Sequence, residues 1–404
     1  MTQHLTIGER VAWYRRRRGL SQDVLAGLVG RTADWLGKVE NNRIDLDRLS
    51  VIRALAHALD VSIGDLIGEP TLLEWSKDSG RRTVPALREA LMDYQLLTPF
   101  VGTPTAGEPP ALATLRSDVG EVWDAYQASQ YGFAARQLPL LLSDALLAVR
   151  TYSGGERDEA NGLLAMVYQG AAMVLGKLGE TELAWIAADR GLAAAQLSGN
   201  KVITGSLLRS VTHCLLSTGR FETAAQLVKD AASLLEPCLA TATPGYLSVY
   251  GTLFLTGSMA AARAEDRETT RQFLQEAENA AARLGGDANH MWTAFGPTNV
   301  AIHRVATAGE LGDVQIAVDL GPQVDTSGLP VERRVRHSLE VARALSAWNR
   351  IDEALEVVLE AEQMAPEQVR HHYMSRELVL GWIRGTRGRP TRPISDLAER
   401  LRLV

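Results

Sequence analysis

The stretch that decides the fold of the N-terminal part is residues 7–43, IGERVAWYRRRRGLSQDVLAGLVGRTADWLGKVENNR. Apolar residues recur in it at helical spacing as far as Gly19, and Ser21 then supplies an N-cap for a second helix. Gly30 ends that helix before Thr32 caps a third. Two short helices joined by a tight turn form a helix-turn-helix, so this stretch predicts one.

Two more short helices are expected directly after this motif. Asn42 stands where a left-handed residue is wanted at the end of the third helix, and asparagine tolerates that conformation well. A fourth helix is expected from about Leu46, and Ser62 with Asp65 reads as a capping box for a last turn ending at Gly68. The sequence therefore predicts a head of five helices.

The head resembles the DNA-binding domain of the lambda-repressor type, or XRE family, over residues 7–68. The shared features are the glutamine after the N-cap, the LAxxVG turn, the glutamate of helix three and the final VSxxDL. The resemblance implies that Gln22 donates to a DNA phosphate. It also implies that Arg15 and Glu40 form a structural pair.

In this family the exposed face of helix three reads base edges. The matching positions here are Thr32, Ala33, Asp34, Gly37 and Lys38. Lys38 can donate to guanine and Asp34 can accept from cytosine N4, although Asp34 can instead repel the phosphates. Trp35 either packs against helix two or contacts a thymine methyl or a sugar.

Basic residues flank that face. Arg16, Arg17 and Arg18 form a run with Arg15, and Arg43 follows helix three. We expect Arg43 and some of this run to contact phosphates, the alternative for the run being a solvated helix face. Residues 1–68 carry ten Lys/Arg against eight Asp/Glu, whereas the rest of the chain carries 32 against 40. The head is thus slightly basic and the body is acidic.

Residues 69–112 change in composition, because prolines and glycines crowd them. Only a segment near residues 84–94 has amphipathic helical spacing. We expect a linker with one embedded helix, which lets the head take more than one orientation.

From residue 113 to 404 the chain is rich in Ala and Leu, with helical spacing and no alternating strand pattern. Turn signals recur at residues 131–133, 178–180, 218–220, 264–266, 308–310 and 348–350. Small residues at fixed offsets from these turns resemble the tetratricopeptide repeat; an irregular helical solenoid is the alternative. We therefore predict an all-α protein, with the head at 1–68, the linker at 69–112 and the repeat body at 113–404. In plan it resembles bacterial, especially actinobacterial, XRE-type transcription regulators with a tetratricopeptide sensor body.

Counting back from the turns predicts which side chains face the groove of such a stack. The candidate ligand-binding residues are Arg209, His213, Asn299, His303, Arg336 and Arg343. Their cationic and amide character on an acidic body favours a ligand with a carboxylate or phosphate. Pro297, in the first turn of its helix, is expected to leave free N–H groups as a further anion site. The alternative is that each of these residues only packs or caps.

Several functions find no support in the sequence. We expect no enzyme, because no phosphate-binding loop, nucleophile elbow or metal-ligand spacing is present. No cofactor or metal is predicted, and Cys214 and Cys238 are read as packed thiols. Neither a membrane span nor a secretory signal is expected, so the cytoplasm is the predicted compartment.

Two functions remain in view. The first is a transcription regulator that binds a double-stranded DNA operator as a homodimer and senses a peptide or an anionic small molecule. The second is a protein-interaction adaptor in which the helical repeats recruit partners and the head is a vestigial or protein-binding module.

Overall fold

The computed structural model describes residues 5–44, 46, 48–61, 63–67, 80–92, 107–386 and 390–403, and the side chains of all of these except 80–83. Within these ranges the regular elements are α-helices and short 3-10 helices, with a lone bridge between Ala288 and Phe295. The predicted all-α class is confirmed.

The head begins the chain. Its helices are α1 (Ile7–Arg17), α2 (Gln22–Leu28), α3 (Ala33–Glu40), α4 (Leu49–Leu59) and α5 (Ile63–Ile67). Ser21 and Thr32 cap α2 and α3 through their hydroxyl oxygens, as predicted. Asn42 has a φ of 53°, which confirms the left-handed residue after α3. Helix α4 begins at Leu49 and not near Leu46, and the predicted capping serine, Ser62, lies outside the described residues.

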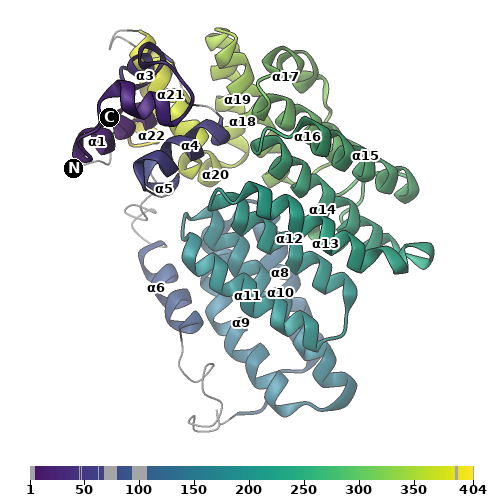
Figure 1. The fold of residues 1–404 in the computed structure, drawn as a ribbon. Helices are drawn as coiled ribbons and strands as arrows, with labels where there is room; N and C mark the ends of the chain where they lie inside the picture. The colour runs from purple at the N-terminus through teal and green to yellow at the C-terminus, as the bar shows by residue number, and fades with distance from the viewer. Residues whose placement is uncertain are drawn as a thin grey trace.

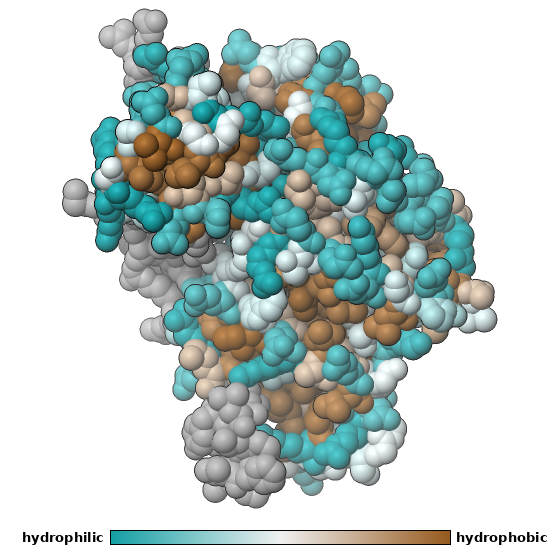
Figure 2. All heavy atoms as spheres, in the orientation of Figure 1, coloured by the Kyte–Doolittle hydropathy of each residue, from teal (hydrophilic) through white to brown (hydrophobic). Residues whose placement is uncertain are grey.

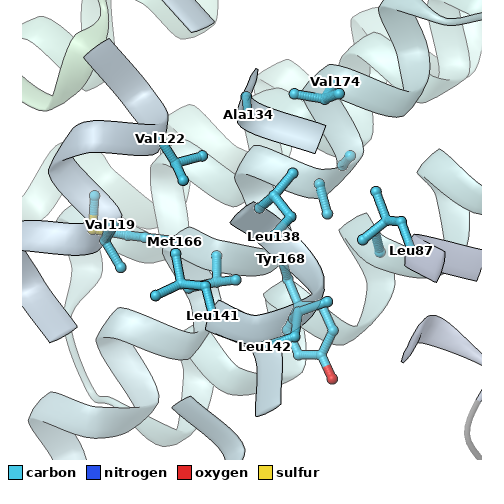
Figure 3. Packing of buried hydrophobic residues seen from close by; sticks show 14 of the residues in the cluster. Leu87, Val119, Val122, Ala134, Leu138, Leu141, Leu142, Met166, Tyr168 and Val174 are labelled. Atoms are coloured by element: carbon cyan, nitrogen blue, oxygen red, sulfur yellow. The ribbon is translucent and has the colours of Figure 1, made fainter. Parts of the chain in front are cut away.

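The helix predicted inside the linker is α6 (Gly80–Leu91). Its Val84, Leu87 and Leu91 are buried in the same apolar cluster as residues of α8 (Leu112–Gln127) and α9 (Tyr131–Thr151). Figure 3 shows Leu87 at the edge of this cluster, with Leu138 of α9 the labelled side chain next to it. Helix α6 is therefore packed on the body.

The body is a stack of antiparallel helix pairs (Figure 1). After α8 and α9 the pairs are α10 (Gly154–Lys177) with α11 (Thr181–Leu197), α12 (Lys201–Ser217) with α13 (Phe221–Leu235), α14 (Pro244–Arg263) with α15 (Arg267–Leu284), α16 (Pro297–Glu310) with α17 (Val314–Leu320), and α18 (Val331–Ala347) with α19 (Ile351–Met364). The 3-10 helices are η1 (Glu236–Thr241), η2 (His290–Trp292) and η3 (Gly321–Gln323). The first helices of successive pairs contact one another, as in a tetratricopeptide-like solenoid.

Each pair is joined by the same kind of turn. A left-handed residue stands at its centre: Ser129, Gly179, Gly219, Glu265, Gly312 and Asn349. The N–H of the next residue then donates back to a carbonyl five residues earlier, at 2.9 Å in every case.

Two of the predicted turns are wrong by three residues, since the turns lie at 128–130 and 311–313. Gly309 was the basis for the predicted turn at 308–310. It lies inside α16, where a Cβ would be 2.9 Å from Nη2 of Arg343. That glycine serves close packing and not a turn.

The last helices bring the end of the solenoid back to its start. They are α20 (Pro366–His371), α21 (Tyr373–Gly385) and α22 (Arg392–Arg400). The Ser129 hydroxyl donates to Oε1 of Gln368 at 2.7 Å, and Gln368 donates in turn to the Glu332 carbonyl at 3.1 Å. Nζ of Lys177 lies 2.5 Å from Oε1 of Glu332, which ties α10 to α18. Residues more than 150 positions apart therefore meet at one centre.

Helix α9 is long and apolar enough to cross a membrane by length and composition. It packs between α8, α10 and α6, with Leu138, Leu141 and Leu142 buried among them (Figure 3). The apolar core of the body accounts for this composition.

Candidate functional site

The helix-turn-helix is braced by one buried ion pair. Arg15 of α1 donates from Nε and Nη2 to the two carboxylate oxygens of Glu40 at 2.5 and 2.7 Å. Arg15 also donates to the carbonyl of Leu20, which fixes the turn between α1 and α2. Fork-like pairing of this kind adds geometric precision as well as energy. The predicted structural role of Arg15 and Glu40 is confirmed.

Helix α3 presents its predicted reading face to solvent. Lys38 and Asp34 are both exposed and form an ion pair at 2.7 Å, one helical turn apart. The Thr32 hydroxyl oxygen accepts from the Trp35 amide as the N-cap of α3. Nε2 of Gln22 donates to Glu40 at 2.8 Å, so one of its two N–H groups remains for a phosphate.

Ala33 and Gly37 complete the predicted face and are half-buried. Gly37 lies against the Gln22 side chain, where a Cβ would be 3.6 Å from Oε1. Trp35 packs against the core of the head, and Arg31 lies 5.6 Å from its ring centroid. These contacts agree with the packing interpretation of Trp35.

Two arginines of the basic run contact other residues of the head. Arg17 lies over the Trp13 ring at 5.1 Å, and Arg18 donates to the Ala58 carbonyl at 3.2 Å. Arg16, Arg17, Arg18 and Arg43 are all exposed. Their contact with phosphate stays a prediction.

The head rests on the body through α4 and α5. Ser50, which is buried, donates to Glu265 at 3.0 Å. Nη1 of Arg53 lies 2.7 and 2.6 Å from the carboxylate oxygens of Glu222. Ile63 fills the space above Gly219, where a Cβ would be 2.2 Å from its Cδ1. We call this contact the head seat; in this structure the head therefore has one packed orientation.

The head seat lies at the ends of the inner helices. Gly219, Glu265 and Gly312 are the left-handed residues that end α12, α14 and α16, and each touches a residue of the head. Apolar residues of these helices, such as Leu216 and Met259, also share the apolar cluster of the head. The same helices carry most of the predicted ligand-binding residues.

Four of the six predicted ligand-binding residues converge. Arg209 and His213 of α12 and His303 of α16 lie within electrostatic reach of Arg333, and Arg336 of α18 acts on both histidines. Burial, followed by Arg333, lowers the pKa of Arg209 to about 10 and that of His303 to about 3. Burial, followed by Arg209 and Arg333, holds the pKa of His213 well below its ordinary value. Both imidazoles are therefore neutral at physiological pH.

Arg343 belongs to a neighbouring network of ion pairs. Its Nη2 lies 2.8 Å from Glu340, and its Nη1 lies 3.8 Å from Glu310. Arg336 pairs with Glu340 at 3.5 Å, and Arg263 pairs with Glu310 at 3.4 Å. Arg343 is thus already engaged inside the protein.

Asn299 is fully buried and does not line a groove. Its Nδ2 donates to the Ala294 carbonyl at 2.9 Å. The predicted anion site at the start of α16 is wrong, because Asp287 occupies it. Its carboxylate accepts from the Thr298 amide at 3.0 Å and from the Thr298 hydroxyl at 2.6 Å. Pro297 does stand in the first turn, as expected.

Three residues of the converging group were not predicted from the sequence: Lys177, Glu332 and Arg333. Burial opposes ionisation of Glu332, but Lys177 and Arg333 outweigh it and lower its pKa. Arg333 and Arg336 are one helical turn apart, which was the available signal. Lys177 stands at the end of α10 and meets this group only because the solenoid closes.

Two comparisons concern the head. Residues 6–67 match the helix-turn-helix domain family. The chain is also 31% identical over 70 residues to the immunity repressor protein of Bacillus phage phi105, which covers 17% of this chain. The chain spans about half the length, 48%, of that curated relative.

Solved structures resemble the whole chain more loosely. A Rap protein in complex with competence and sporulation factor aligns over 90% of this chain and 100% of its own, with 12% identity and a TM-score of 0.48. Aspartyl phosphate phosphatase F from Bacillus subtilis aligns over 89% and 93%, with 12% identity and 0.45. PlcR of Bacillus thuringiensis with the peptide PapR7 and DNA aligns over 69% and 95%, with 14% identity and 0.30.

All three TM-scores are below 0.5, so the fold described above is drawn from the contacts within this chain alone. Residues 6–67 are a helix-turn-helix domain, and the chain joins that domain to an all-helical repeat body.

Proposed function

We propose that the protein is a transcription regulator that binds operator DNA through α3 and senses a ligand through its repeat body. The ligand is a peptide or an anionic small molecule, and the working form is a homodimer in the cytoplasm. The proposal assigns the chain no catalytic role.

The observation that carries the proposal is the head seat. It leaves Asp34 and Lys38 of α3 exposed while α4 and α5 lie on the body. A domain of the helix-turn-helix family held in this way has its predicted reading face available to the major groove.

The head seat also supplies a route from ligand to DNA. Helix α12 carries Arg209 and His213 and ends at Ser217, two residues before Gly219, which lies against Ile63 of the head. A ligand that shifts α12 therefore shifts the support of the head. A coupling free energy of about 1–3 kcal/mol changes DNA affinity about 5- to 150-fold.

Genomic pull-down of the intact protein followed by footprinting tests the proposal. A single small head makes few contacts, so we expect protection of two half-sites about one helical turn apart, or a multiple of that. A single half-site bound by a monomer in solution would contradict the dimer. No sequence-specific protection at any site would contradict DNA readout.

One observation favours the adaptor as a second candidate. Figure 2 shows apolar atoms gathered on the head. Its exposed large apolar side chains include Val24 and Leu28, which lie one turn apart on α2 and are 50% and 62% exposed. An adaptor would bind a protein through this face. Loss of partner binding in Leu28→Ser without loss of footprinting would assign the patch to that role.

A further inference from the structure

Arg209 is a buried cation with no ion-pair partner among the described residues. Its residue is 3% exposed, and its Nε has no hydrogen-bond acceptor among the described residues. No described carboxylate forms an ion pair with it. An unpaired buried charge is costly, since desolvation is not repaid by a counter-charge. The protein keeps such a group in a place that the solenoid has built from several helices.

The surroundings of Arg209 have an excess of positive charge. The residues of this centre and its adjoining ion-pair network are Lys177, Arg209, Arg263, Arg333, Arg336 and Arg343 on the basic side, and Glu310, Glu332 and Glu340 on the acidic side. Each of the three carboxylates already faces a cation at 3.5 Å or less. Arg333 reaches Glu332 only at 3.9 Å and leaves its own Nε without a partner. Among the described residues, Arg209 and Arg333 are therefore the two cations of this group without a carboxylate at 3.5 Å or less, and Glu332 attracts Arg209 only from beyond ion-pair distance.

The two histidines refine the chemistry of this site. Nδ1 of His303 lies 2.9 Å from the Asn299 carbonyl, and because a carbonyl can only accept, Nδ1 carries the proton. The neutral ring then offers Nε2 as an acceptor. His213, four residues after Arg209 on α12, is also neutral because of burial and the cations around it. A bound group therefore meets cationic donors on one side and a neutral acceptor nearby.

We propose that Arg209 and Arg333 bind an oxyanion, a carboxylate or a phosphate, whose molecule also carries a hydrogen-bond donor for His303. This deepens the proposed function by naming the ligand chemistry of the sensing site. Hydroxy acids, amino acids, phosphorylated metabolites and acidic peptides share that chemistry. Fork-like pairing of a guanidinium with either oxyanion supplies the binding energy.

The test compares Arg209→Met with Arg263→Met in the full chain. Arg209→Met should raise the Tm of the ligand-free protein, because it removes an uncompensated buried charge. Arg263→Met should lower the Tm, because it leaves Glu310 without its closest cation, at 3.4 Å. A fall in the Tm of Arg209→Met equal to that of Arg263→Met would overturn the proposal.

Binding is measured by calorimetry with inorganic phosphate, succinate, serine, phosphoserine and a tetrapeptide of aspartate. At least one probe should bind the wild type saturably, and Arg209→Met should weaken it about 10- to 100-fold. Comparing phosphate and phosphoserine with succinate and the peptide shows whether the site prefers a phosphate or a carboxylate. Serine tests the contribution of the hydrogen-bond donor that faces His303. No saturable binding, or equal binding by wild type and Arg209→Met, would overturn the site.

Operator binding is measured in parallel to keep the two proposals apart. For each protein the operator affinity with the probe is divided by the affinity without it; this ratio should differ from one in the wild type and equal one in Arg209→Met. If a probe binds through Arg209 but leaves operator affinity unchanged, the oxyanion site stands and the sensing function fails.

Discussion

Replacing Gly219 with alanine tests whether the head is held by the turns beneath it. Gly219 has a φ of +74°, and a Cβ there would lie 2.2 Å from Cδ1 of Ile63. Gly199 is the matched control, because its φ is +65° and nothing lies within 4 Å of an added Cβ. Both substitutions carry the left-handed penalty of about 1–2 kcal/mol. Only the first also pushes on the head.

The additional destabilisation of the head seat by Gly219→Ala follows from the burial of Ile63, which is 7% exposed. Full burial of such a side chain contributes about 1.5–3 kcal/mol, which is the upper limit for what Gly219→Ala removes at the head seat. Hydrogen exchange of the α4 and α5 amides is the assay, because it reports local opening. Exchange there should accelerate by up to about 10- to 150-fold in Gly219→Ala and stay unchanged in Gly199→Ala.

A double variant separates the contact from general damage. With Ile63→Ala already in place, Gly219→Ala should add no more to the exchange of α4 than Gly199→Ala does, since the clashing Cδ1 is gone. Equal exchange of α4 and α5 in Gly219→Ala and Gly199→Ala, in the presence of Ile63, would refute the reasoning.

Three further outcomes are expected. Lys38→Ala should relax preference at one base position by about 1–3 kcal/mol, seen by operator selection, whereas equal selectivity would remove Lys38 from readout. His303 has a folded pKa of about 3, below the unfolded value near 6.5, so its contribution is present above pH 6.5 and is lost as pH falls toward 3. His303 should therefore contribute about 1.4 kcal/mol per pH unit to the fall of the unfolding free energy in that window, and His303→Gln should reduce the slope by that amount. Lys177→Met should cost about 3 kcal/mol by leaving Glu332 buried without its closest cation, and adding Glu332→Gln should recover part of it in denaturant titration.

The head could be read from sequence because its signals are local. Ser21 and Thr32 cap the helices that begin at the next residue, and Asn42 adopts a left-handed conformation. Each of these residue types therefore predicts its own local structure. The pair of Arg15 and Glu40 came from the resemblance, since 25 positions separate them.

The body was predictable as a class but not in register. Gly309 and Gly312 are both plausible turn residues, and only the approach of Arg343 to Gly309 tells them apart. Counting from Gly309 in place of Gly312 selected Asn299 and His303 together; Asn299 is fully buried with its Nδ2 bonded to the Ala294 carbonyl, whereas His303 belongs to the converging group. Lys177 was missed for a different reason: its partner is 155 positions away and depends on closure of the whole solenoid.

The common turn geometry gives α12 the properties of a lever. Arg209 lies eight residues before the end of α12 at Ser217, so about 12 Å of rigid helix separates the oxyanion site from the turn beneath the head. A tilt of α12 by about 4° moves its far end by about 1 Å over that length. Packed contacts such as the one between Gly219 and Ile63 do not absorb displacements of that size, so the head must follow. A small group that draws Arg209 toward Arg333 can therefore reposition a whole domain without unfolding any part of it.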